Sequence, residues 1–141
     1  MNVATADPVT ITRTTPRARV VALATAGGAA LANLLVFALG SLAGVEFSVL
    51  TPMADTAETV TAVPVLAMSA IMGLLGSFAL WATKRWAPRS WSILAALGLA
   101  IGVVSMPLFA DATLGTKLTL SSMHLITALT FFVSTRRELR R

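Results

Sequence analysis

The stretch KRWAPRSW, residues Lys84–Trp91, is the only charged, proline-bearing break between two long apolar segments, 62–83 and 91–110. It holds three of the cations and two of the three tryptophans, and Trp81 lies just before it. Tryptophan prefers the boundary between hydrocarbon and water, and Lys and Arg in short loops mark the cytoplasmic side of a membrane. We therefore predict that this loop lies at the inner face of a membrane and that the chain folds about it as two helical hairpins.

The composition supports a membrane protein. Of the 141 residues, 56% are hydrophobic and only 12% are charged, whereas soluble domains carry about 25% charged residues. The net charge of +5 lies at the chain ends and in loops, which favours membrane orientation over nucleic-acid binding. The absence of Cys excludes disulfides and thiolate metal sites.

Four apolar runs are long enough to cross a bilayer, since a spanning helix needs roughly 20 residues. A flexible tail (1–19) precedes them and a basic tail (136–141) follows. The first run could instead be a cleavable signal peptide ending near Ala43, but signal cores are only about 7–15 residues long. We therefore predict an all-α integral membrane four-helix bundle with spans at 20–44, 62–83, 91–110 and 118–135.

The sequence does not decide where the second helix begins. Asp55 and Glu58 have the spacing of a capping box, so a helix could begin there. Pro64 follows too late to be the first residue of that helix. Either the second helix is kinked at Pro64, or a short surface helix precedes it.

The distribution of cations predicts the orientation. With four spans, ten of the eleven Lys and Arg residues fall on one side and only Lys117 on the other. This asymmetry places both termini in the cytoplasm. The acidic residues Glu46, Asp55, Glu58 and Asp111 then lie on the outer side.

An Arg-flanked first helix, a short basic loop after the second, Met123-His124-Leu125 in the fourth and an Arg-rich end form a recognisable combination. In these features the chain resembles a family of small four-helix actinobacterial membrane proteins of unknown function. The resemblance covers most of the chain after the tail. It implies a four-span bundle and assigns no activity or functional residues.

Small residues recur four apart on the first three helices, as lipid-embedded helices require for close backbone packing. We expect them to pack helices within one bundle, with contact to a second protomer as the alternative. The predicted packing glycines are Gly28, Gly40, Gly44, Gly73, Gly98 and Gly102.

Polar residues within the spans are candidates for function, because they are costly in a bilayer. His124 is the only histidine, and we expect it inside the bundle, with Asp111 its closest charged neighbour. His124, Asp111 and Glu46 could hold a metal or relay a proton if they converged. The alternative is a neutral histidine satisfied by a hydroxyl or a carbonyl. For Asn33, near the middle of the first helix, we predict a structural hydrogen bond between helices.

The sequence thus predicts a small multi-pass protein of the plasma membrane, without enzymatic activity, catalytic residues, metal or cofactor. Its expected partners are the lipid bilayer and either a second copy or a larger membrane protein, with no nucleic acid. A small oligomeric transporter or channel with a polar site around His124 is the first alternative. A membrane enzyme acting at the outer face is the second.

Overall fold

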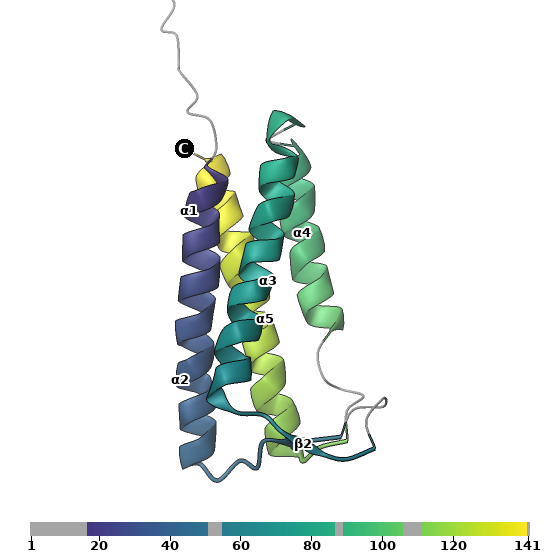
Figure 1. The fold of residues 1–141 in the computed structure, drawn as a ribbon. Helices are drawn as coiled ribbons and strands as arrows, with labels where there is room; N and C mark the ends of the chain where they lie inside the picture. Colours follow the sequence, from purple (N-terminus) through teal and green to yellow (C-terminus); the bar gives the residue numbers. More distant parts are fainter. Residues whose placement is uncertain (1–16, 51–54, 87–88, 106–110, 141) are drawn as a thin grey trace, which may run out of the picture.

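A computed structural model describes residues 17–50, 55–86, 89–105 and 111–140, and this part of the chain is mostly helical (Figure 1). The first long helix is built from α1 (Ala18–Ala22), the π-helical turn η1 (Leu23–Gly27) and α2 (Gly28–Leu42). The other long elements are α3 (Ala62–Ala82), α4 (Arg89–Val104) and α5 (Leu114–Leu139). The short elements are β1 (Ser48–Val49), β2 (Glu58–Thr59) and the 3-10 turn η2 (Lys84–Trp86).

The helices run alternately down and up, side by side (Figure 1). The beginning of α1, the end of α5 and the connection between α3 and α4 lie at one end of the molecule, which we call the hinge end. At the opposite end β1 and β2 form an antiparallel pair, in which Ser48 faces Thr59. Leu50 also bridges to Asp111, so that the two loops of this end are joined.

Among the described residues, three helical segments are long and apolar enough to cross a membrane: Ala18–Leu42, Ala62–Ala82 and Leu114–Leu139. The α4 helix has 16 residues, or about 24 Å at 1.5 Å per residue, against a hydrocarbon core of about 30 Å. The predicted third span, 91–110, therefore reaches only Val104 as a described helix. Residues 106–110, including Pro107, lie outside the described residues, as do residues 1–16 of the predicted tail.

Gly44 ends the first helix and does not pack against another one, which corrects the prediction made for it. Its φ of +78° is a conformation that glycine adopts without steric cost. The Gly44 amide donates to Ser41 O and the Val45 amide to Gly40 O, at 3.1 and 3.0 Å. These two bonds make a Schellman motif. A Cβ added at Gly44 would have no other residue within 4 Å.

The second long helix begins at Ala62 and residues 55–61 contain no helix, so the helix start left open at Asp55 is not formed. Glu58 lies in β2, where it faces Val49. The backbone groups of β2 form hydrogen bonds with β1, so they are not available to the first turn of a helix. Pro64 is the third residue of α3, in the first turn, where an amide has no helical acceptor and proline is tolerated.

The α5 helix is longer than the predicted span of 118–135. The Thr113 side chain accepts a hydrogen bond from the Thr116 amide at 3.3 Å and caps its start. Its end reaches Leu139, inside the predicted basic tail. There Glu138 is buried, and one of its carboxylate oxygens accepts from the Arg17 amide at 3.1 Å. The Glu138 carboxylate of α5 therefore lies next to the N-terminus of α1, where the helix dipole favours negative charge.

In the part of the chain that the structure describes, two apolar clusters hold the helices together. At the hinge end, Val21, Leu80, Trp91 and Phe131 pack as one group. At the opposite end, Phe47 packs with Val65 and Met123 beneath the loops.

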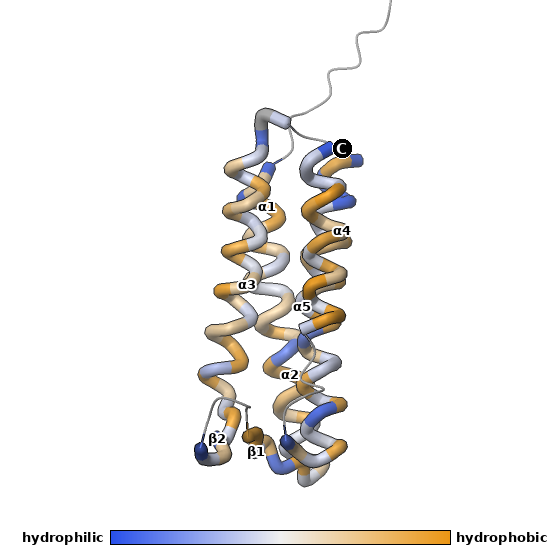
Figure 2. Tube along the Cα trace, turned by 90° about the vertical axis from the view of Figure 1, so that its right-hand side faces the viewer, coloured by the Kyte–Doolittle hydropathy of each residue, from blue (hydrophilic) through white to orange (hydrophobic). Residues whose placement is uncertain are grey.

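The outer faces of the helices are also apolar. Leu31, Leu35 and Leu39 on α2 are more than half exposed. Figure 2 shows hydrophobic residues along the length of the helices, with hydrophilic residues concentrated toward the two ends. Such a continuous exposed apolar surface requires a partner or a lipid environment.

Candidate functional site: a lateral cavity beside a buried amide

Asn33 links three helices through its side-chain amide. Its Nδ2 donates to Ser69 Oγ on α3 at 2.8 Å and to Thr127 Oγ1 on α5 at 2.9 Å. Asn33 itself is 2% exposed. An amide in an apolar interior must find such partners, because an unsatisfied polar group there is costly.

The hydrogens of this network are fixed by its geometry. Ser69 Oγ donates to Val65 O at 2.7 Å, and Thr127 Oγ1 donates to Met123 O at 3.0 Å. Each hydroxyl has a single proton, so both must act as acceptors toward Asn33. The Asn33 Nδ2 therefore supplies both donors. Its Oδ1 is buried and has no hydrogen-bond partner among the described residues.

A cavity of about 570 Å³ lies next to this network, between α3 and α4 and over α5. The two helices diverge away from the hinge end (Figure 1). The lining side chains Met68, Met72 and Ile101 are each more than half exposed. Because exposed residues of both helices form its rim, the cavity opens sideways through the α3–α4 face.

The floor of the cavity is formed by α5, including Met123, His124 and Thr127, and Asn33 lines its inner side. Thr25 of the π-helical turn also lines it and is fully buried, and its hydroxyl has no partner in the described part of the chain. Most of the lining is apolar, and the polar groups are few, as is typical of small-molecule sites.

His124 is exposed and faces this cavity, which corrects the prediction that it is enclosed among polar groups of other helices. Its Nδ1 lies 3.0 Å from Leu120 O, one turn earlier on the same helix. A carbonyl only accepts, so Nδ1 carries the proton in this bond. The alternative expectation, a histidine satisfied by a carbonyl, describes it better.

Asp111 and Glu46 do not join His124. Asp111 pairs with Leu50 through the backbone, and the Glu46 carbonyl accepts from Thr116 Oγ1. The α5 helix begins at Leu114, so His124 lies about 15 Å along the axis from its start. Within the described ranges, no group of three His, Cys, Asp or Glu residues could hold a metal ion.

Four of the predicted glycines pack between helices or against a loop. A Cβ at Gly73 would lie 2.7 Å from the Ala26 backbone nitrogen, and one at Gly98 would lie 2.8 Å from the Phe131 ring. At Gly102 it would overlap the Ala128 Cβ, and at Gly40 it would lie 2.9 Å from Phe47. Gly28, whose nearest neighbour would be Thr130 at 3.8 Å, makes only an ordinary contact.

Sequence reasoning missed the partners of Asn33 and the unpaired hydroxyl of Thr25. Neither Ser69 nor Thr127 stands out among the many hydroxyl residues of the apolar segments. Hydroxyls in apolar helices are common and bond back to their own helix, so a single residue gives no signal. The useful signal is an amide and two hydroxyls on three different helices at similar depth.

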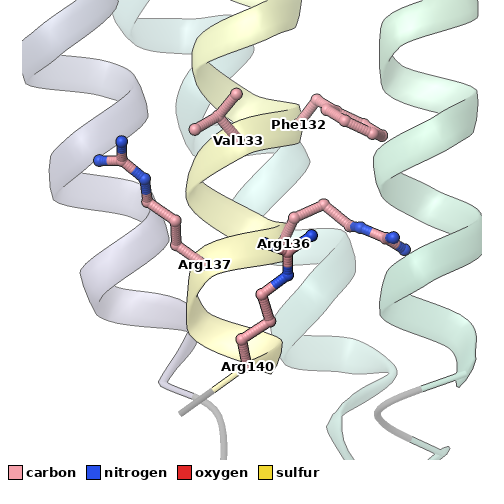
Figure 3. A pocket seen from close by; sticks show the side chains of 5 residues that line it. All are labelled: Phe132, Val133, Arg136, Arg137 and Arg140. Atoms are coloured by element: carbon pink, nitrogen blue, oxygen red, sulfur yellow. The ribbon is translucent and has the colours of Figure 1, made fainter.

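The arginines at the end of α5 form no convergent site. A shallow pocket of about 250 Å³ is lined by Phe132, Val133, Arg136, Arg137 and Arg140. Figure 3 shows that the side chains of Arg136 and Arg137 extend to opposite sides of α5. The Arg136 guanidinium lies 5.9 Å from the centroid of the Phe132 ring. Charges spread in this way suit a membrane boundary better than the binding of one anion.

Comparison with protein families identifies the chain. Residues 13–141 match the family of unknown function DUF6069. The chain belongs to this family. No match was found among curated proteins or among solved structures. Family membership agrees with the resemblance to proteins of unknown function; an actinobacterial origin stays a prediction.

Proposed function

We propose that this DUF6069 member is a four-span protein of the plasma membrane, a bundle of two helical hairpins with both termini in the cytoplasm. Among the described cations, Arg17, Arg19, Arg89 and those of η2 and the end of α5 belong to the hinge end, and Lys117 to the other. Placing the hinge end inside follows the preference of Lys and Arg for the cytoplasmic side. The exposed leucines of α2 then face lipid.

The proposed role is that of a non-enzymatic accessory component that holds another membrane constituent in its lateral cavity. The observation that carries this role is the cavity of about 570 Å³, which opens between α3 and α4 through apolar residues. The polar groups beside it, Asn33, Ser69 and Thr127, are engaged mainly in linking helices. These hydrogen bonds serve the structure. The rest of the cavity lining is mostly apolar and suits an apolar ligand.

A small transporter or channel is the second candidate, because His124 and Asn33 line the same cavity. In that case water should reach the cavity. The outer-face enzyme loses its geometric basis, since His124, Asp111 and Glu46 are held at separate places.

Site-specific photo-crosslinking in cells tests the proposed role. The photoreactive residue p-benzoylphenylalanine at Met72, on the rim, should give an adduct that survives delipidation. The same residue at Leu74, on the same helix and similarly exposed, is the control and should give none. Equal adducts at both positions, or none at either, would contradict a specific site in the cavity.

The orientation is tested with single-cysteine variants, which are clean because the chain has no native Cys. In intact cells an impermeant thiol reagent should label Thr56→Cys and should label Thr5→Cys only after the membrane is permeabilised. Labelling of Thr5→Cys from outside would refute the proposed topology.

A further inference from the structure

The cavity between α3 and α4 is closed at one end by an aromatic ring. A Cβ added at Gly76 of α3 or at Gly98 of α4 would lie 2.8 Å from the Phe131 ring, so the ring fills the space between the helices at that level. Within the described ranges the lining ends at these three residues. At its other limit the lining residues Pro64 and Ser105 are exposed. The cavity is therefore closed toward the hinge end and open toward the opposite end.

The length of the cavity matches one leaflet of a bilayer. On α5 its lining runs from Leu120 to Phe131, and on α3 from Pro64 to Gly76, which are about 16 and 18 Å at 1.5 Å per residue. The hydrocarbon core is about 30 Å thick, so one leaflet takes about half of this length. A lipid tail that enters from the open end would lie along α5 and reach Phe131.

A transmembrane helix fits this cavity less well than a lipid tail. A spanning helix needs roughly 20 residues, or about 30 Å, whereas the cavity stops at Phe131. Beyond that ring, the hydrogen bond from Trp91 to Leu80 holds α4 against α3. The methionines of the lining, Met68, Met72 and Met123, are unbranched and adapt to irregular shapes. Such a lining suits a flexible chain.

A cation lies at the open end of the cavity floor. Lys117 comes one turn before Leu120 and two turns before His124, which both line the cavity, so the three residues follow one stripe of α5. Helical side chains lean toward the N-terminus of their helix, which directs Lys117 away from the hinge end. Lys117 is half-buried, and no acidic side chain of the described residues forms an ion pair with it. A lipid whose tail fills the cavity would hold its headgroup near this cation.

We propose that the cavity binds one acyl chain of an anionic phospholipid from the outer leaflet, with the negatively charged headgroup beside Lys117. This inference rests on the proposed function, since it names the membrane constituent held in the cavity. It also uses the proposed orientation, in which the Lys117 end is the outer one. Phe131 limits how deep the tail reaches, and Lys117 sets the preference for a negative headgroup.

Photoreactive lipids test the proposal on the full chain. The protein is reconstituted in phosphatidylcholine vesicles that contain a trace of photoreactive phosphatidylglycerol or of photoreactive phosphatidylcholine, both with the same diazirine-bearing acyl chain. Mass spectrometry of peptides locates the adducts. On the cavity floor, residues 120–131, phosphatidylglycerol should give about fivefold more adducts than phosphatidylcholine, as expected for one cation near an anionic headgroup.

Variants separate the role of the charge from that of the cavity. Lys117→Gln should reduce the preference for phosphatidylglycerol to below about twofold, whereas Arg136→Gln, which removes one cation from the hinge end, should leave it unchanged. Met72→Trp fills the rim and should remove most adducts of both lipids from residues 120–131. Leu74→Trp, on the same helix and similarly exposed, is the matched control and should remove neither.

The outcomes distinguish this inference from the proposed function. Equal adducts of the two lipids on the unmodified chain, with loss of both in Met72→Trp, would overturn the anionic lipid and leave the proposed function standing. A preference that survives Lys117→Gln would overturn the headgroup assignment in the same way. Adducts on residues 120–131 that Met72→Trp does not reduce would overturn both proposals. A protein-sized adduct at Met72 in cells would overturn the lipid and retain an accessory role.

Discussion

The two ends of the α3–α4 pair differ sharply. At the hinge end, Trp91 is fully buried, and its Nε1 donates to Leu80 O at 2.8 Å. Ser90 Oγ also bonds to Thr83 O, at 3.3 Å. At the other end, Met72 and Ile101 lie on opposite sides of an open cavity.

This difference shows what holds helices together in an apolar environment. Lipid tails are as apolar as leucine, so apolar side chains gain little by leaving lipid for one another. Helices stay in contact where polar groups pair or where small residues let backbones approach. The α3–α4 pair has polar pairing only near the hinge, whereas α4 follows α5 because Gly98 and Gly102 admit Phe131 and Ala128.

The largest expected effect comes from replacing a glycine at the contact between α4 and α5 with a larger residue. In Gly102→Leu, the new side chain would overlap Ala128, so α4 must move away from α5. We expect destabilisation of about 3 kcal/mol, at the upper end of overpacking costs, seen as a lower melting temperature in detergent. Gly27→Leu is the control, because Gly27 has no neighbour within 4 Å. Equal melting temperatures for both variants would contradict the assigned interface.

The next effect concerns the polar pairing at the hinge end. Trp91→Phe removes the donor to Leu80 O and part of a buried ring, and should destabilise the protein by about 2 kcal/mol. Trp81→Phe is the matched control, since Trp81 is 54% exposed, and should cost less than about 0.5 kcal/mol. If the order of these two effects were reversed, the hinge end would not be held by Trp91.

The smallest expected effect tests whether the buried Asn33 amide acts through its hydrogen bond to Ser69. A double-mutant cycle of Asn33→Leu and Ser69→Ala should give a coupling energy of about 0.6–1.7 kcal/mol, the range for hydrogen bonds between membrane helices. A cycle of Asn33→Leu and Ser77→Ala should show coupling near zero, because Ser77 bonds to its own helix. Equal coupling in both cycles would mean that Asn33 acts through general packing.

The sequence predicted the positions of the helices better than the relations between them. Long apolar runs predicted the helices at 20–44 and 62–83 to within about two residues at each end, because apolar length is a local property. The π-helical turn at Leu23–Gly27 has no comparable sequence signal. Glu58 was misplaced because pairing with β1 is a contact between separate parts of the chain.

The candidate site was predicted only in part, because Asn33 and His124 line the cavity whereas Asp111 and Glu46 lie elsewhere. Asn33 was expected to bond between helices, and it does so with Ser69 and Thr127. His124 was expected to face inward, but a helix that is apolar on all sides gives no period from which its direction can be read. The cavity depends on how α3 and α4 diverge, which no single segment encodes.

The most direct test of the proposed architecture is the environment of the cavity rim. A spin label on Met68→Cys, in the protein reconstituted in a bilayer, should collide frequently with lipid-soluble oxygen and rarely with a water-soluble nickel chelate. Such a result is predicted for a cavity that opens sideways into the membrane. Frequent collision with the nickel chelate and rare collision with oxygen would contradict it and would indicate an aqueous path.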